Sequence, residues 1–149
     1  MWQGLFHDLS KYLPSEFLCG AKYYQGDKSP NDMERRVSGY SKAWMHHKGR
    51  NRHHFEYWTD YNPKTKRVEP VDMPDKYIIE MFMDRIAASK VYMKDNYTDR
   101  SPLEYYNRGN GKIILHEHTR ELFERCLEKL AEQGEEKTFA YIKREVLRK

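Results

Sequence analysis

The spacing of apolar residues between positions 74 and 94 constrains the fold of this chain more than any other feature. In PDKYIIEMFMDRIAASKVYMK, large apolar residues recur every three or four positions, at Tyr77, Ile78, Met81, Phe82 and Ile86. This period matches the 3.6-residue turn of an α-helix that buries one face. The segment therefore predicts a long amphipathic core helix that Pro74 opens.

The rest of the chain shows the same helical pattern in shorter segments. Further helices are predicted over residues 2–13, 14–24, 33–48, 52–59, 117–133 and 135–148, with a short helix and turn at 100–112. Turn-forming residues predict loops at 25–32 and 60–73, and Gly134 separates the last two helices. No run shows the convincing apolar–polar alternation of a half-buried strand. The predicted fold class is therefore all-α.

The length of the chain predicts a single domain. With 149 residues, we expect one helical domain over 1–149, in which residues 107–149 form a C-terminal helical extension. Hydrophobic content is only 38%, but 12 Tyr, 6 Phe and 3 Trp make the apolar side chains large. Because aromatic side chains bury much area each, a core without disulfides is expected.

Charge and cysteine content restrict the classes of partner. A net charge of +4 fits a phosphorylated small molecule, a nucleotide or nucleic acid, but it is mild for a dedicated nucleic-acid arm. Two cysteines, Cys19 and Cys126, are too few for a secreted disulfide scaffold and favour a cytoplasmic protein with reduced thiols. No apolar stretch approaches the roughly 20 residues of a membrane span, so no membrane partner is expected, whereas a homo-oligomer is compatible with these features.

Four of the seven histidines fall in HHKGRNRHHF, residues 46–55. They form two His-His pairs, at His46, His47, His53 and His54. A metal site, a nucleic-acid contact surface and chance in a loop are the three interpretations, and imidazole nitrogens are common ligands of transition metals. The basic residues between the pairs ordinarily form a solvated face, but beside a metal they would suit a phosphate group: Lys48, Arg50 and Arg52.

Two further acidic positions carry candidate metal ligands. His7 and Asp8 are adjacent in HDLSK, and Lys11 lies one helical turn after His7, where it could hold a phosphate. Asp84 lies within the most apolar predicted helix, in line with its buried stripe. Because an unpaired buried carboxylate is costly, we expect a metal or a basic partner at Asp84. Arg85 is the weaker alternative, since neighbours in sequence do not face each other on a helix.

These residues carry a family resemblance. The HDLSK segment, the later His-His pair and the Asp of MDRIAASK are similar to the HD-domain metal-dependent phosphohydrolases. More closely, HDLSKYLPSEF, GYSKAWMHHKGRNRHHFEYW and MPDKYIIEMFMDRIAA together resemble a family of unknown function, DUF5662, over roughly residues 3–106. The HD resemblance implies an all-α, HD-like helical bundle and a site that contains one or more divalent metal ions.

The HD resemblance also assigns roles to residues of this chain. The implied metal ligands are His7, Asp8, His46, His47, His53, His54 and Asp84. The implied reaction is hydrolysis of a phosphomonoester or phosphodiester, such as a nucleotide. The candidate catalytic residues are Asp8, Lys11 and Glu56. The candidate phosphate-binding residues are Lys11, Lys48, Arg50 and Arg52. For Glu56 the alternative is a salt bridge to Arg50 or Arg52. Histidine and aspartate ligands without thiolates suit Mn²⁺, Fe²⁺, Ni²⁺, Co²⁺ or Zn²⁺.

One departure from the HD pattern affects the ligand set. HD proteins place their first metal-binding histidine on a helix before the dyad, but only six residues precede His7 here. Three alternatives follow: the natural chain starts upstream and contains the first helix, or one histidine of the two later pairs replaces the ligand, or the site lacks it. The sequence therefore predicts a bundle in which the first HD helix is missing or lies outside this chain.

Two other classes of protein are compatible with the same residues. HHKGRNRHH has the residue types of a His/Asn one-metal nuclease, although such a centre is normally built on a ββα hairpin and strand signals are lacking. The second alternative is a non-catalytic protein. A metal would stabilise it, or it would bind nucleic acid or another protein through residues 48–52 and the aromatic residues around them. His116 and His118 are expected at the surface, near a helix start.

Overall fold

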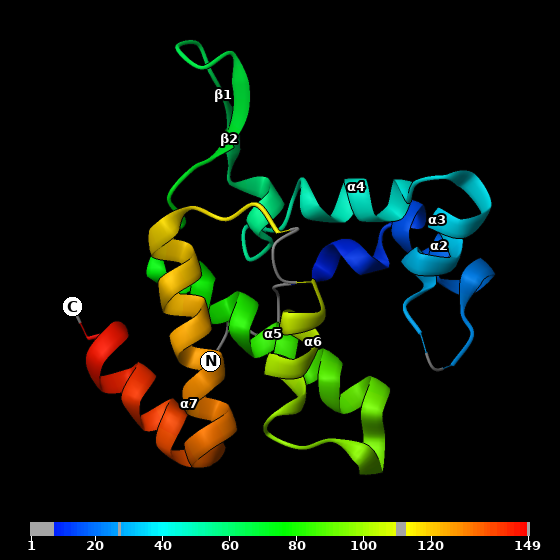
Figure 1. The fold of residues 1–149 in the computed structure, drawn as a ribbon. Helices are drawn as coiled ribbons and strands as arrows, with labels where there is room; N and C mark the ends of the chain where they lie inside the picture. Colours follow the sequence, from blue (N-terminus) through cyan, green and yellow to red (C-terminus); the bar gives the residue numbers. More distant parts are fainter. Residues whose placement is uncertain (1–7, 27, 110–112, 149) are drawn as a thin grey trace. The chain divides into compact units, whose positions relative to one another are not determined.

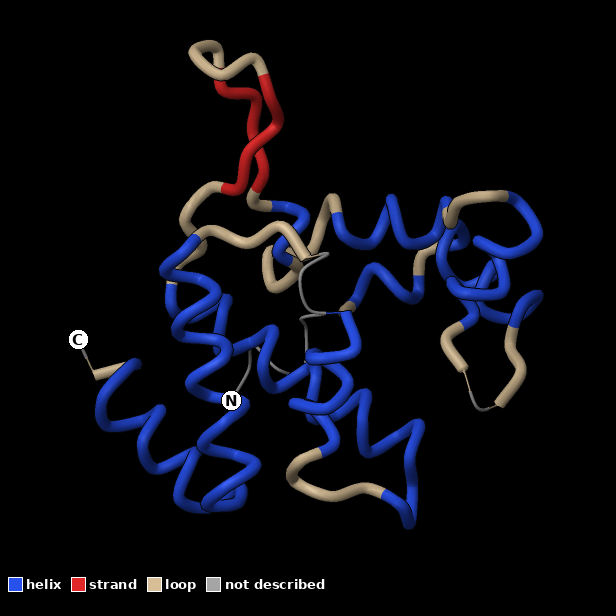
Figure 2. The backbone as a smooth tube through the Cα atoms, viewed as in Figure 1, coloured by secondary structure: helices blue, strands red, loops and turns tan. Residues whose placement is uncertain are grey.

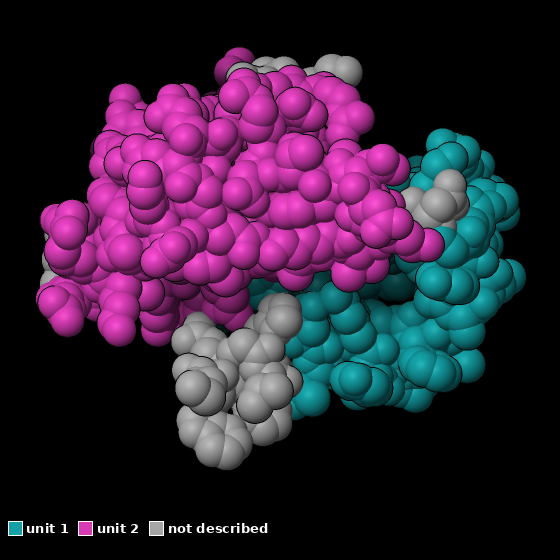
Figure 3. All heavy atoms as spheres, turned by 90° about the horizontal axis from the view of Figure 1, so that it is seen from below, with its two compact units in different colours: residues 1–57 teal, residues 58–149 magenta. Residues whose placement is uncertain are grey.

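Helices dominate the computed structural model, which describes residues 8–26, 28–109 and 113–148 (Figure 1). One small two-stranded sheet accompanies them in these ranges (Figure 2). The all-α class predicted from helical periodicity is confirmed. By contacts the chain divides into two compact units, residues 1–57 and 58–149, which are coloured separately in Figure 3.

The first unit consists of short helices. They are the 3₁₀ helix η1 (Leu9–Tyr12), α2 (Pro14–Tyr23), α3 (Pro30–Ser38), α4 (Lys42–Lys48) and the 3₁₀ helix η2 (Phe55–Tyr57). Proline opens α2 and α3, where the first N–H groups have no partner inside the helix. The prediction of one helix over residues 33–48 is wrong. Gly39 takes a positive φ of 78° and ends α3, and Ser41 then caps α4 by accepting a hydrogen bond from the Trp44 N–H at 2.9 Å.

A buried carboxylate connects the helices of the first unit. Glu34 Oε2 in α3 accepts hydrogen bonds from Ser41 Oγ at 2.6 Å, from Cys19 Sγ of α2 at 3.1 Å and from the Ala43 N–H at 3.4 Å. Burial raises the pKa of Glu34, but the hydrogen bonds from Ser41, Cys19 and the backbone outweigh it and hold that pKa below its usual value. Burial and the Glu34 carboxylate raise the pKa of the Cys19 thiol to about 11. Glu34 therefore joins α2, α3 and the start of α4 as a charged acceptor.

The second unit begins with a β-hairpin, which corrects the expectation that the chain has no strands. Strand β1 (Thr59–Asn62) pairs antiparallel with β2 (Arg67–Pro70), with Tyr61 opposite Val68. Each strand has four residues, and both are largely exposed, so the hairpin has no buried face to impose an alternating pattern. Side chains stabilise it instead, because Glu69 accepts hydrogen bonds from Asn62 and Thr65, each at 2.6 Å.

The helices of the second unit enclose an apolar core. They are α5 (Asp75–Met93), the 3₁₀ helix η3 (Lys94–Asn96), α6 (Ser101–Gly109), α7 (Glu117–Tyr141) and the π-helix η4 (Ile142–Val146). The stripe predicted for residues 74–94 is confirmed, with Ile78, Met81, Phe82 and Ile86 buried. Helix α7 packs on α5 and adds further buried side chains, namely Leu122, Phe123, Cys126, Leu127 and Leu130.

Gly134 interrupts α7 as the sequence predicts. Its φ of 79° and ψ of 173° lie outside the helical region, in a conformation that is essentially restricted to glycine. The chain therefore changes direction between the two halves of α7. The prediction of a single domain with residues 107–149 as its C-terminal extension stays a prediction. No described helix is long and apolar enough to cross a membrane.

Candidate metal centre

Three segments of the first unit bring a cluster of histidines and carboxylates together. The first contains Asp8 and η1, the second is the opening turn of α2 with Glu16, and the third runs from the end of α4 to residue 54. These segments are distant in sequence. The side chain of Asn51 donates a hydrogen bond to Ser10 Oγ at 2.8 Å, although the two residues are 41 positions apart. The site is therefore built by tertiary contacts within the first unit.

The end of α4 determines where the histidines lie. Gly49 terminates the helix, and a Cβ at this position would approach the Met45 carbonyl oxygen to 3.2 Å. Asn51 then turns back, and its side-chain Nδ2 donates to the carbonyl of His47 at 2.8 Å. This closed turn gives one of the last carbonyls of α4 a donor. It also brings His53 and His54 back beside His47.

The imidazoles of the cluster are close to one another and buried. Three histidines form the cluster, His47, His53 and His54. Each has a ring nitrogen that lies within 4.8 Å of a ring nitrogen of both other histidines. The rings of His53 and His54 have centroids 4.2 Å apart, and that of His54 lies 4.7 Å from both the His47 ring and the Trp44 ring. Trp44 therefore forms an apolar wall on one side of the cluster.

Asp8 adds a carboxylate to these imidazoles. Its Oδ1 lies 3.5 Å from His47 Nε2 and 3.6 Å from His53 Nε2. Its Oδ2 pairs with Lys11 Nζ. The side chain of His53 is 2% exposed and that of Asp8 is 16% exposed, so both are shielded from bulk water. The Asp8 carboxylate thus lies beside two of the three clustered imidazoles, those of His47 and His53.

Glu16 binds the other side of the His46–His47 pair. Its Oε1 lies 2.6 Å from His46 Nδ1 and its Oε2 lies 2.8 Å from His47 Nδ1. A carboxylate only accepts, so each Nδ1 is the protonated nitrogen. In the neutral form of His47 the lone pair is then on Nε2, which faces Asp8. Ser10 supports this arrangement by donating to Glu16 Oε2 at 3.1 Å.

Sequence analysis missed Glu16, Ser10 and the structural role of Asn51. Glu16 follows Pro14 in the first turn of a helix, where an acid is favoured by the helix dipole whether or not it has another role. Its burial is the distinguishing feature, since it is the only buried residue of α2. Glu16 lies eight residues after Asp8 in the sequence, but this spacing does not predict a contact with His46, which is thirty positions away.

The predicted phosphate-binding residues lie at the edge of the cluster or on the surface. Lys11 is more than half exposed despite its pairing with Asp8. Arg50 is exposed and donates to the His46 carbonyl at 3.5 Å, and the guanidinium of the exposed Arg52 lies 6.0 Å from the centre of the Tyr57 ring. Lys48 is half-buried at the end of α4.

The remaining predicted site residues stay predictions. His7 lies outside the described residues. Glu56 is half-buried in η2, next to the cluster in sequence. Asp84 is half-buried on α5, in the second unit, and its role as a metal ligand stays a prediction. His46 contacts Glu16 through Nδ1, so its other nitrogen is the one available for a ligand.

The hairpin bears on the nuclease alternative. Strands β1 and β2 are followed by α5, in the ββα order that a His/Asn nuclease uses. However, neither strand nor α5 contains a histidine, and both His-His pairs precede the hairpin. The clustered imidazoles therefore do not lie on the ββα element that defines that class.

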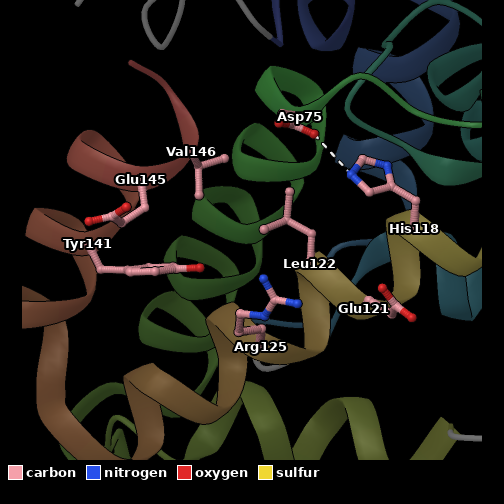
Figure 4. A pocket seen from close by; sticks show the side chains of 8 residues that line it. All are labelled: Asp75, His118, Glu121, Leu122, Arg125, Tyr141, Glu145 and Val146. Atoms are coloured by element: carbon pink, nitrogen blue, oxygen red, sulfur yellow. Dashed lines mark ion pairs between the residues drawn. The ribbon is translucent and has the colours of Figure 1, made fainter. Parts of the chain in front are cut away.

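A pocket in the second unit contains different chemistry. Figure 4 shows Arg125 and Tyr141 directed toward the same space beside Leu122 and Val146. At its edge Asp75 Oδ1 lies 3.2 Å from His118 Nε2, and Asp72 lies 2.8 Å from the other nitrogen of His118. The side chain of His118 is 45% exposed, as expected from the sequence, so these contacts lie at the surface.

Comparison with known proteins identifies the family. The profile of a family of unknown function, DUF5662, matches residues 1–129 of the 149, and the chain belongs to this family. No curated protein and no solved structure matches the chain. The closer of the two resemblances seen in the sequence is thus confirmed, whereas the likeness to HD-domain phosphohydrolases stays a prediction.

Proposed function

We propose that the cluster binds a divalent transition-metal ion and that the protein is a metal-dependent phosphohydrolase of HD-like type. The observation that carries the proposal is the approach of His47 Nε2 and His53 Nε2 to the same oxygen of Asp8, at 3.5 and 3.6 Å. These separations are too long for a well-formed N–H···O hydrogen bond. They are close to the roughly 3.0–3.5 Å that separates neighbouring ligand atoms around an ion bound at about 2.0–2.2 Å.

The contacts of Glu16 support the same interpretation. Histidines that ligate metals usually donate their other N–H to a carboxylate or a carbonyl, which fixes the tautomer and the ring orientation. Glu16 provides this contact for His47 and also for His46. The donor set of histidine and aspartate, without a thiolate, suits Mn²⁺, Fe²⁺, Ni²⁺, Co²⁺ or Zn²⁺. Asp8, His47, His53 and His54 are the residues that would hold the ion.

The surrounding charges favour a phosphate ester as the substrate. When bound, a divalent ion polarises a phosphoryl oxygen and lowers the pKa of water. Lys11 would attract a second phosphoryl oxygen, because its ammonium is at the edge of the cluster and more than half exposed. Arg50 and Arg52 extend the positive charge. A phosphomonoester, a phosphodiester or a nucleotide is the proposed substrate class, and free thiols at Cys19 and Cys126 fit a cytoplasmic location.

A second candidate function follows from the composition of the first unit's core. Among its described residues Ala43 is the only buried apolar one, and the other buried residues are polar or charged: Glu16, Glu34, Ser41, His47, Asn51, His53 and His54. A core of this kind provides little hydrophobic stabilisation. An ion ligated by Asp8 and by the histidines of the distant segment 47–54 would then stabilise the fold itself, as structural metals do. This observation favours a metal-stabilised protein without catalysis.

Metal analysis combined with turnover assays separates the two candidates. Protein purified without a His tag should contain near-stoichiometric transition metal, and Asp8→Asn or His53→Gln should remove it. His118→Gln is the matched control, because it changes a histidine that is paired with carboxylates outside the cluster. Lys11→Met should keep the metal but lower the hydrolysis of p-nitrophenyl phosphate or its bis ester in Mn²⁺, Ni²⁺ or Co²⁺.

The outcomes are distinct. Metal with turnover that depends on Lys11 supports the hydrolase. Metal without turnover supports the metal-stabilised protein and rejects the hydrolase. If wild-type protein contains no metal and does not take it up from solution, both candidates are wrong.

A further inference from the structure

The large apolar side chains of the first unit lie mostly on its surface. Among the residues of this unit that the structure describes, ten are exposed: Leu9, Tyr12, Leu13, Phe17, Leu18, Tyr24, Val37, Tyr40, Met45 and Tyr57. Scattered exposed apolar residues are normal, but a contiguous group marks a contact surface. The first six come from one continuous segment, η1 and α2, and we call them the α2 face.

Helical geometry places the centre of this face on one side of α2. Leu13, Phe17 and Tyr24 are spaced by four and seven positions, so they project from the same side of the helix. Their exposed fractions are 44%, 59% and 71%, and that of the adjacent Leu18 is 65%. A different side of the helix contains the buried Glu16 and the half-buried Cys19, which bind α4 and α3. Helix α2 therefore has an inner polar side and an outer apolar side.

We infer that the α2 face is the interface of a homodimer, in which it packs on the same face of a second copy of this chain. Six large side chains exposed by about half or more offer on the order of 700 Å², at about 150–250 Å² for each complete aromatic side chain. A stable interface buries about 800 Å² per partner. The area of the α2 face is therefore close to what two copies need.

The charge of the face favours a second copy over a charged partner. Between residues 9 and 24 the only acidic residue is Glu16, which is buried, so the face has no exposed carboxylate to attract a basic protein. Its two lysines are exposed but have partners within the chain, Lys11 with Asp8 and Lys22 over the Tyr23 ring at 5.0 Å. The six side chains of the face carry no charge themselves, so the same face of a second copy can pack on them about a two-fold axis.

Sedimentation velocity over a wide concentration range tests this inference. Wild-type protein should sediment as a dimer that dissociates on dilution, and Phe17→Ser combined with Leu18→Ser should raise the dissociation constant at least about a hundredfold, because both copies lose two buried apolar side chains. Both residues are exposed in the single chain, so the variant should keep its circular dichroism spectrum. Val37→Ser is the matched control, since Val37 is 62% exposed on α3 and outside the face.

Hydroxyl-radical footprinting identifies what covers the face. If the inference holds, Phe17 and Leu18 are protected at high concentration and lose protection on dilution. Protection that does not change on dilution of a monomer means that the chain covers its own face, and overturns the inference. Three other results also overturn the inference. They are a monomer that binds phospholipid vesicles through the face, a monomer whose face is unprotected, and a dimer that the double substitution leaves intact.

Discussion

Glu16 shows how one side chain can organise a site without joining the ligand set. Its two oxygens bind the Nδ1 atoms of His46 and His47, which leaves Nε2 of His47 facing Asp8. The geometry on the far side of the His47 ring therefore depends on a carboxylate that is not itself a ligand. At the scale of single residues, this is the contact on which the proposed metal affinity depends.

Replacing Glu16 tests that dependence. Glu16→Gln keeps one oxygen acceptor but presents an N–H₂ group to the second histidine, so one ring loses its partner. Metal affinity should fall about 10–100-fold, as for other carboxylate partners of ligating histidines. Competition with a chromophoric chelator measures the affinity, and Asp32→Asn, an exposed acid of the same unit, is the control. Equal affinity in the variant and the wild type contradicts the role assigned to Glu16.

At the scale of elements, Glu34 makes the stability of the first unit depend on pH. Its pKa is below the ordinary value of 4.5 because hydrogen bonds to the carboxylate outweigh the effect of burial. A group whose pKa is lowered by folding stabilises the fold above its unfolded pKa and loses this contribution as the pH falls through the folded pKa. We therefore expect the first unit to lose stability as the pH falls below 4.5.

The variant Glu34→Gln isolates this contribution. At neutral pH it should lower the free energy of unfolding by about 1–3 kcal/mol, because three donors lose a charged acceptor. The difference from wild type should shrink as the pH falls below 4.5, where the native carboxyl also becomes protonated. Urea titrations followed by Trp fluorescence at several pH values measure it. A difference that is independent of pH means that the effect is steric.

The kink of α7 provides a second test at this scale. Gly134 has a φ of 79°, and a Cβ there would lie 3.3 Å from Asp99 Oδ2. Gly134→Ala should therefore destabilise the protein by about 1–3 kcal/mol, the usual cost of a strained backbone conformation. Gly20→Ala, in α2 with no atom within 4 Å of the added carbon, should be neutral or stabilising. Thermal unfolding monitored by circular dichroism compares them, and equal melting temperatures for the two variants contradict the prediction.

At the scale of the whole molecule, the two units differ in what stabilises them. The second has an apolar core on α5, α6 and α7, which includes Phe82, Phe123 and Leu127. Burial of such side chains contributes about 1.5–3 kcal/mol each. In its described part, the first unit buries imidazoles and carboxylates and a single apolar residue, Ala43. If those groups hold an ion, the stability of the first unit depends on it, whereas the second unit has a stable core without it.

Removal of metal should therefore open the two units unequally. Limited proteolysis in the presence of EDTA should cleave first within residues 8–57, and excess Mn²⁺ or Zn²⁺ should restore resistance. An ion at a hundredfold excess over its Kd stabilises the bound state by about 2.7 kcal/mol. Asp8→Asn should be cleaved equally with and without chelator. A cleavage pattern that EDTA leaves unchanged in wild-type protein contradicts this expectation.

Sequence alone determined the helical class, the amphipathic stripe of α5 and the break at Gly134, because each depends on neighbours within a few turns. It also showed which histidines to examine, since the two pairs are adjacent in the chain. Only the tertiary structure revealed Glu16 as the partner of His46 and His47, thirty or more positions away. Likewise, it showed that Gly39 divides the predicted helix over 33–48 and that side-chain hydrogen bonds stabilise an exposed hairpin. The physical reason is one of range: helical periodicity is encoded locally, whereas burial and long-range hydrogen bonds exist only once distant segments meet.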